Sequence, residues 1–187
     1  MVEIIGLQVN TITKVYEGVS PPTITSPGDI FREYNSSNLL IEEWYRDASN
    51  STWYSTKEYK YNLPFTQVTA TSTLRLFPDI PLDNTFNLFL TRSSAIASVS
   101  GTNSATQYWT LNLQRIAKTG AVTSVSPLLS TQSLAVNNYH LLGNPNLNLA
   151  INPVAVNLAS FVVTCGRIST ASALNLAFTL YFKKQRL

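Results

Sequence analysis

Acidic residues are absent from the last 104 residues of this chain, which begin at Asn84. That stretch still holds seven basic residues, while all ten acids lie in residues 1–83. The whole chain has one histidine, His140, and one cysteine, Cys165. Enzymes cluster these residue types for acid–base, nucleophilic and metal chemistry. We therefore expect a protein that is not an enzyme, with no cofactor, no metal site and no small-molecule substrate.

A single cysteine excludes an internal disulfide bond. Cys165 ends the apolar run Phe161–Cys165, which indicates a buried structural thiol rather than a nucleophile. The first residues, Met1–Ile5, show no basic stretch followed by a long apolar one, so we expect no signal peptide and synthesis in a cytoplasm. No apolar run approaches the roughly 20 residues of a membrane span, so none is expected.

Charge of either sign is also scarce, because charged residues make up 12% of the chain, about half the usual share. Serine, threonine and asparagine take their place, with 58 residues. Such a polar, uncharged surface suits packing against copies of the same chain, although a secreted lectin has a similar composition. The acidic first part and the basic second part also favour head-to-tail contact between copies, weakened by salt.

The chain has one compact group of basic residues, formed by Lys183, Lys184 and Arg186. It is interpreted either as a solvated C-terminus or as a contact to a phosphate or an acidic neighbouring subunit. The other bases are spread thinly, so the sequence gives no support for nucleic-acid binding.

The dominant periodicity of the chain is two. In segment 174–182, leucine and phenylalanine alternate with asparagine, alanine, threonine and tyrosine, and similar alternation runs through 68–76, 86–91 and 109–114. A strand with one face in a core and the other in water has this pattern, which predicts antiparallel sheets. Further strands are expected at 4–16, 39–46, 53–61, 133–142, 147–151 and 154–165.

Turn residues separate these segments, and eight to ten short strands predict an all-β fold with an antiparallel β-sandwich or barrel. We expect the sandwich over 29–187, after an N-terminal arm or first strand and a proline-rich loop over 1–28. Segment 38–45 fits a helix as well as a strand. We favour a hairpin in which Glu42 and Glu43 face Lys57 and Lys60.

Aromatic residues gather between positions 31 and 65, among charged and amide side chains. Aromatic rings provide wide, rigid contact surfaces for sugars, bases or other proteins. Three interpretations stay open for them: core packing, a protein interface, and stacking on a ligand. The residues selected for an interface or for stacking are Trp44, Tyr45, Trp53, Tyr54, Tyr59 and Trp109.

Other candidate sites are weaker. Glu42 and Glu43 are adjacent, so on a strand they point to opposite faces and do not form a catalytic pair, even with Asp47 nearby. Asp79 and Asp83 are too sparse for a calcium site. His140 has no second histidine or cysteine near it, and the scattered glycines form no phosphate-binding loop.

In strand rhythm, polar loops, low charge and extended N-terminal segment, the chain resembles the single jelly-roll proteins of icosahedral viruses and phages, such as penton (vertex), minor capsid and decoration proteins. The resemblance implies a jelly roll of about eight strands, with the arm pairing with a neighbour. It implies a homo-oligomer located in the virion, whose partners are its own copies and other capsid proteins.

The expected function is therefore that of a structural virion protein, which acts by self-assembly and by contacts with neighbouring capsid subunits. The alternative is a glycan- or receptor-binding β-sandwich, such as a phage fibre head or a carbohydrate-binding module. In that alternative, exposed tryptophans stack on the sugar.

Overall fold

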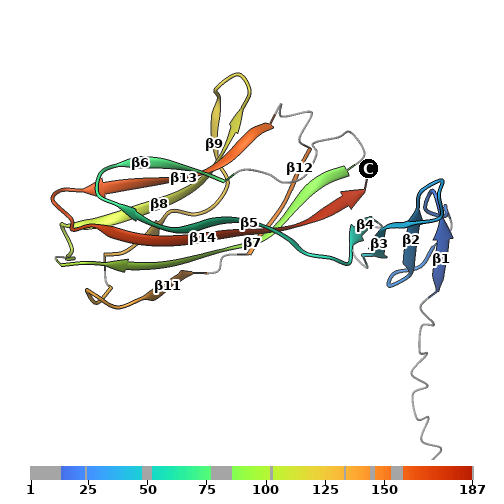
Figure 1. The fold of residues 1–187 in the computed structure, drawn as a ribbon, viewed down its shortest axis with the longest axis horizontal. Coiled ribbons are helices and arrows are strands. Elements are labelled where there is room, and N and C mark those ends of the chain that lie inside the picture. Colours follow the sequence, from blue (N-terminus) through green and yellow to red (C-terminus); the bar gives the residue numbers. More distant parts are fainter. Residues whose placement is uncertain are drawn as a thin grey trace, which may run out of the picture. The chain divides into compact units, whose positions relative to one another are not determined.

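A computed structural model describes residues 14–23, 25–47, 52–76, 86–101, 103–132, 134–143, 146–152 and 158–186 (Figure 1). The described residues form fourteen strands and no helix. The prediction of an all-β, mainly antiparallel β-sandwich is confirmed. The described residues contain no helix, and thus no helix that is long and apolar enough to cross a membrane.

The chain divides into two compact units, Met1–Lys57 (unit 1) and Glu58–Leu187 (unit 2). This division differs from the boundary expected after Gly28. The reason is that the proline-rich segment connects two paired strands of unit 1 instead of separating an arm from the sandwich. Most of the expected arm, residues 1–13, lies outside the described residues.

Unit 1 is a four-stranded sheet. Strand β2 pairs in parallel with β1 and antiparallel with β3, which pairs antiparallel with β4. The bounds are β1 Val15–Gly18, β2 Ile30–Tyr34, β3 Leu40–Arg46 and β4 Trp53–Ser55. The preferred hairpin at 38–45 is thus confirmed over the helix. Its expected ion pairs differ, because Glu43 binds Arg32 of β2.

The segment between β1 and β2 is held by a buried carboxylate, Asp29, which is 1% exposed. Its two oxygens accept hydrogen bonds from the backbone N–H groups of Ser26 (2.7 Å) and Lys14 (3.0 Å). The Ser26 bond is the main cause that lowers the pKa of Asp29, against the opposing effect of burial. This carboxylate ties the end of the connection to the start of β1.

Unit 2 contains two sheets. In the first, β14 lies between β5 and β7, and the short strands β11 and β12 pair with different parts of β7. Its bounds are β5 Tyr59–Val68, β7 Phe86–Val99, β11 His140–Gly143, β12 Asn146–Ile151 and β14 Leu174–Arg186.

In the second sheet, β13 lies between β6 and β8, while β9 and β10 pair with different parts of β8. Its bounds are β6 Ser72–Leu76, β8 Tyr108–Ala117, β9 Val122–Ser124, β10 Leu129–Ser130 and β13 Leu158–Ile168. Within unit 2, the connections pass from one sheet to the other, except those between β8, β9 and β10 and the one between β11 and β12.

The core of unit 2 is formed by the alternating side chains of both sheets. On β14, the five predicted inward residues, Leu174 to Phe182 in steps of two, are each at most 2% exposed. The predicted inward sets of β7 and β8 are buried as well. The period-two pattern therefore identified the buried faces of these strands correctly.

Candidate interaction surfaces

Most of the aromatic residues selected from the sequence lie in the interior. Trp44, Trp53, Tyr54 and Trp109 are 4%, 6%, 3% and 0% exposed, so they offer no stacking platform. Core packing, one of the three interpretations of these aromatics, describes them, and the exposed tryptophans that the glycan-binding alternative requires are not found among them. In unit 1, Trp44 and Trp53 pack with Phe31, and the Trp44 indole N–H donates to Glu33 (2.9 Å).

The remaining two selected aromatics are half-buried, and they lie in different units. The ring of Tyr45 is 5.8 Å from that of Tyr54 in unit 1, between centroids. Tyr59 stacks on Phe182 in unit 2 at 5.5 Å. The aromatic set that is dense in the sequence therefore serves two separate cores.

The basic residues Lys183, Lys184 and Arg186 belong to β14, in register with the start of β7. They are half-buried, and the ammonium group of Lys184 lies 5.0 Å from the Tyr59 ring centre. Such contacts are cation–π interactions. These three residues are thus part of an ordered strand end, and the contact to a phosphate or an acidic neighbouring subunit stays a prediction.

The single histidine and the single cysteine both have ordinary structural environments. Nε2 of His140 lies 3.1 Å from the Ala135 carbonyl oxygen. Cys165 is fully buried, and burial raises its pKa to about 12, so the thiol stays protonated. In the described part of the chain, no three His, Cys, Asp or Glu side chains converge to hold a metal ion. Asp79 and Asp83 lie outside that part.

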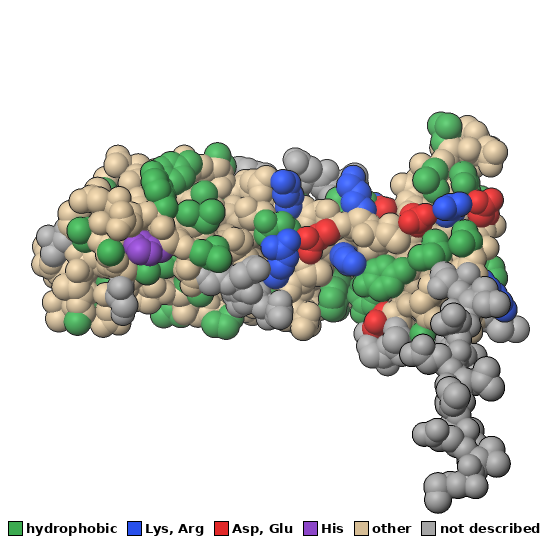
Figure 2. Space-filling view, turned by 90° about the horizontal axis from the view of Figure 1, so that it is seen from below, with side chains coloured by type: hydrophobic (Ala, Val, Ile, Leu, Met, Phe, Trp, Pro, Cys, Tyr) green, Lys and Arg blue, Asp and Glu red, His purple; other side chains and the backbone are tan. Residues whose placement is uncertain are grey.

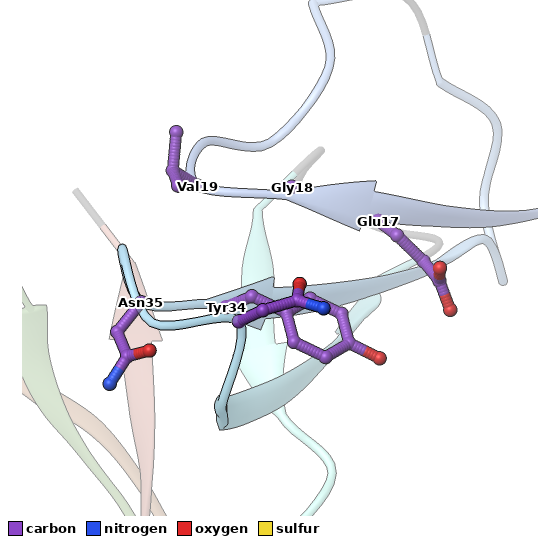
Figure 3. Close-up of a pocket in the computed structure, with 6 residues that line it drawn as sticks. Glu17, Gly18, Val19, Tyr34 and Asn35 are labelled. Atoms are coloured by element: carbon purple, nitrogen blue, oxygen red, sulfur yellow. The ribbon is translucent and has the colours of Figure 1, made fainter.

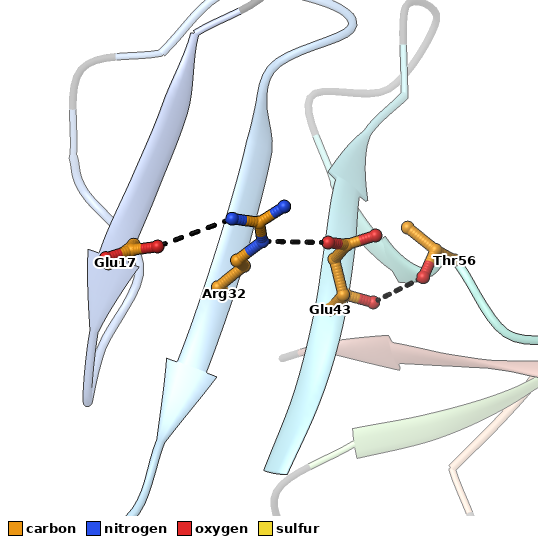
Figure 4. Close-up of polar contacts among 4 residues, drawn as sticks. All are labelled: Glu17, Arg32, Glu43 and Thr56. Carbon is orange, nitrogen blue, oxygen red and sulfur yellow. Dashed lines mark hydrogen bonds and ion pairs between the residues drawn. The ribbon is translucent and has the colours of Figure 1, made fainter. Parts of the chain in front are cut away.

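A row of charges crosses the sheet of unit 1, and sequence reasoning missed it. Arg32 of β2 lies between Glu17 of β1 and Glu43 of β3, with N–O distances of 3.4 Å and 3.0 Å (Figure 4). Glu43 and then Glu17 raise the pKa of Arg32 through these bonds. The sequence does not reveal this row, because Glu17 lies beside Arg32 only through the parallel pairing of β1 with β2. The row has one positive charge for two negative charges.

A shallow pocket of about 330 Å³ opens beside this row (Figure 3). Its lining combines one carboxylate with a tyrosine ring and amide groups, which is no catalytic constellation. The lining residues are Glu17, Gly18, Val19, Tyr34, Asn35 and Asn38.

The turn between β2 and β3, here called the hairpin tip (Asn35–Ile41), is ordered by local hydrogen bonds and ends in exposed apolar residues. The Asn35 side-chain oxygen accepts hydrogen bonds from the backbone N–H groups of Ser37 (3.0 Å) and Leu39 (2.9 Å). Asn38 has φ 59°, a left-handed angle that asparagine tolerates. Three consecutive apolar residues follow, Leu39, Leu40 and Ile41, with exposures of 64%, 54% and 56%.

The connections at one end of unit 2 contain no charged residues, and we call them the charge-free end. They are the connections 69–71, 100–107, 131–139 and 169–173, which contain no Asp, Glu, Lys, Arg or His. One charged side chain reaches them from β13: the Arg167 guanidinium donates to the carbonyls of Thr69 (2.9 Å) and Ala171 (2.6 Å). Hydrogen bonds also fasten the connections together. Gln107 donates to Thr170 (2.8 Å), Gln132 donates to the Ala105 carbonyl (2.9 Å), and Asn103 donates to the Leu134 carbonyl (2.8 Å).

An apolar patch lies next to that end, on the outer face of the first sheet of unit 2. Ile96 of β7 is opposite Leu141 of β11, and the Phe65 ring contacts Tyr139 at 5.6 Å. Their exposures run from 45% to 64%. On the face seen in Figure 2, green side chains lie near the purple histidine, and red or blue ones appear only farther along the unit. We call Phe65, Ile96, Tyr139 and Leu141 the apolar patch.

No protein-family model and no curated protein sequence matches the chain. Among solved structures, three of infectious bursal disease virus are similar: the Gx strain, the Gt strain, and a subviral particle of its VP2 protein. Their TM-scores are 0.39, 0.38 and 0.38, with sequence identities of 13%, 12% and 14%.

These matches are viral capsid structures, and the resemblance to them is weak. They cover 83%, 89% and 88% of this chain but only 37%, 46% and 40% of the viral chains. The chain thus spans less than half the length of each. Scores at this level establish neither a shared fold nor a shared function.

Proposed function

We propose that this chain is a structural protein of a virus particle, which acts by binding copies of itself and other coat proteins. The charge-free end together with the apolar patch carries the proposal. Near a symmetry axis each side chain faces its own copy, so a charged residue there meets like charge. The serine, threonine, asparagine and apolar side chains of these connections avoid that repulsion, and the Arg167 guanidinium beside them is bonded to the Thr69 and Ala171 carbonyls.

The strand order of unit 2 supports a jelly roll, the fold expected from the sequence. The short strands β9 and β10 together occupy one strand position beside β8, and β11 and β12 together occupy one beside β7. Counted in this way, each sheet has four strand positions. The orders are then β5-β14-β7-β11/β12 and β6-β13-β8-β10/β9. This is the order of a jelly roll built from two Greek keys, an architecture of both capsid proteins and lectins.

The experiment that tests this role is the assembly state of the purified chain, measured by mass photometry and electron microscopy. We expect rings or larger assemblies. Leu141→Asp places a charge in the apolar patch and should weaken association by about 10- to 100-fold, the equivalent of losing one buried leucine. Leu128→Asp is the matched control, because Leu128 is 61% exposed outside the patch and the charge-free end. A native chain that stays monomeric at all concentrations contradicts the proposal.

A second candidate is glycan binding, favoured by the exposed aromatic pair Phe65 and Tyr139. Exposed rings of this kind stack on sugars. A glycan-array signal that disappears with Tyr139→Ala, from a chain that does not assemble, supports this candidate instead.

A further inference from the structure

The hairpin tip exposes three consecutive apolar side chains, Leu39, Leu40 and Ile41. Leu40 and Ile41 are consecutive residues at the start of β3, and both are more than half exposed. The pairing of β2 with β3 is irregular at this point, because Tyr34 and Glu33 face Leu40 and Glu42, so Ile41 is the extra residue of a bulge. Runs of three exposed apolar residues are uncommon unless they bind something. The tip therefore offers exposed apolar side chains that a second protein can cover.

Hydrogen bonds within the tip also favour one conformation in the absence of a partner. The Asn35 amide oxygen caps the turn, and the Asn35 N–H donates to the Leu39 carbonyl at 2.9 Å. A loop that already has its bound conformation loses little entropy on association. These bonds make the tip suited to insertion as a preformed unit.

Negative charge lies behind the tip. The Glu17–Arg32–Glu43 row keeps an excess carboxylate, and unit 1 as a whole has seven acids against four bases. Unit 2 has three acids against nine bases. A partner surface on unit 2 therefore complements the charge of the tip.

Unit 2 has a pocket at the β8–β9 turn whose lining is positively charged and consists mainly of small side chains. It measures about 290 Å³ and is lined by Arg115, Ala117, Thr119, Ala121, Thr123 and Leu158. Most of these side chains are small, and the lining includes one guanidinium group and no acid. Lys118, in the turn itself, is exposed and adds a second positive charge. An aliphatic side chain backed by carboxylates fits this chemistry.

We propose that the hairpin tip of one copy docks into the β8–β9 pocket of a second copy. This inference rests on the proposed assembly function and names one of its contacts. Tip and pocket are different surfaces, so the contact is head-to-tail and generates rings or open chains. Added to an association through the apolar patch, it gives each copy the two kinds of contact that an extended shell needs.

Cross-linking of two full-length variants tests the contact directly. One carries Leu39→Cys in the tip and the other Thr119→Cys in the pocket, and a short bismaleimide joins thiols that lie close together. The native Cys165 is buried and does not compete. We expect the mixed dimer in several-fold excess over that from Leu39→Cys with Leu128→Cys, an exposed position of unit 2 outside the pocket. Equal yields overturn the proposal.

Charge reversal tests the electrostatic part. Arg115→Glu in the pocket variant should reduce the cross-linked product several-fold, and Glu17→Lys in the tip variant should restore part of it. Raising the salt to about 1 M, where the Debye length is about 3 Å, should also reduce the native yield. A yield that ignores both the reversal and the salt contradicts docking by complementary charge.

The same samples separate this contact from the proposed function. If Leu141→Asp disperses the assemblies while cross-linking stays at the control level, assembly through the patch stands and the tip contact fails. If cross-linking is specific but Leu141→Asp changes nothing, the tip contact stands and the patch fails. Circular dichroism of each variant confirms that the fold is intact.

Discussion

At the scale of single residues, two glycines with similar backbone angles differ in the space around them. Gly101 has φ 97° and Gly120 has φ 86°. A Cβ atom on Gly101 would lie 2.7 Å from the Ser172 hydroxyl oxygen, whereas one on Gly120 would meet nothing within 4 Å. Alanine at Gly120 therefore introduces backbone strain alone, whereas alanine at Gly101 introduces the same strain together with a steric clash.

We expect Gly120→Ala to lower the free energy of unfolding by about 1 kcal/mol, the cost of a left-handed alanine. Gly101→Ala should lower it by about 2–3 kcal/mol, because Ser172 must also move. Urea unfolding of both variants, followed by circular dichroism, measures the difference. Equal losses would show that the Ser172 contact relaxes freely.

Asp29 gives unit 1 a dependence on pH. Its pKa is lowered from 3.8 in the folded chain, so folding favours the ionised form. The resulting stability is fully present above pH 3.8 and is lost as the pH falls through the lowered pKa. Asp29→Asn should therefore cost about 1–3 kcal/mol near pH 7, with the difference from the native chain shrinking in acid.

Urea unfolding at several pH values, followed by tryptophan fluorescence, measures this dependence. Trp44 and Trp53 are suitable probes because they belong to the same unit as Asp29. A loss of the same size at every pH would mean that the Asp29 charge contributes nothing and that the variant disturbs packing instead.

Sequence reasoning was less reliable for single residues than for patterns. It placed Cys165 in the core correctly, because an apolar run surrounds it. It left the tryptophans open between core packing, an interface and ligand stacking, and Trp44 and Trp109 are buried, with their indole N–H groups donating to Glu33 and to the Ser172 carbonyl. Those partners are 11 and 63 residues away in the chain, so only the fold reveals them.

At the scale of elements, the alternation along β14 makes a sharp mutational prediction. Phe178 is 2% exposed in the core, and its neighbour Thr179 points outward. Phe178→Ala should cost about 3–5 kcal/mol, through lost burial and a cavity. Thr179→Ala should change stability by no more than about 0.5 kcal/mol. Thermal unfolding of both variants checks this, and similar losses would mean that β14 is buried on both faces.

Strand pairing explains which features of the elements were predictable. A period of two reveals the buried face of a strand such as β14, because that face is a local property. The partners of a strand are not local, since β14 pairs with β5 and β7 at distant places in the sequence. The parallel pairing of β1 with β2, and with it the Glu17–Arg32–Glu43 row, had no sequence signal for the same reason.

At the scale of the whole molecule, the two units differ in the size of their cores. The large buried cluster lies entirely in unit 2, where both sheets contribute to it. The buried cluster of unit 1 consists of Phe31, Trp44 and Trp53, with Tyr16 packed against it. Small domains bury too little apolar surface to be stable alone, and larger ones bury enough.

We therefore expect the fragment 58–187 to fold by itself, since it retains every residue of the larger cluster, and the fragment 1–57 to be largely unfolded. Circular dichroism and the fluorescence of Trp109, which is fully buried in unit 2, report the state of the longer fragment. Its urea unfolding midpoint should agree with that of the same unit in the full chain. An unfolded 58–187 fragment would show that the sandwich needs unit 1 for its stability, and the division at Lys57 would then mark no independent folding unit.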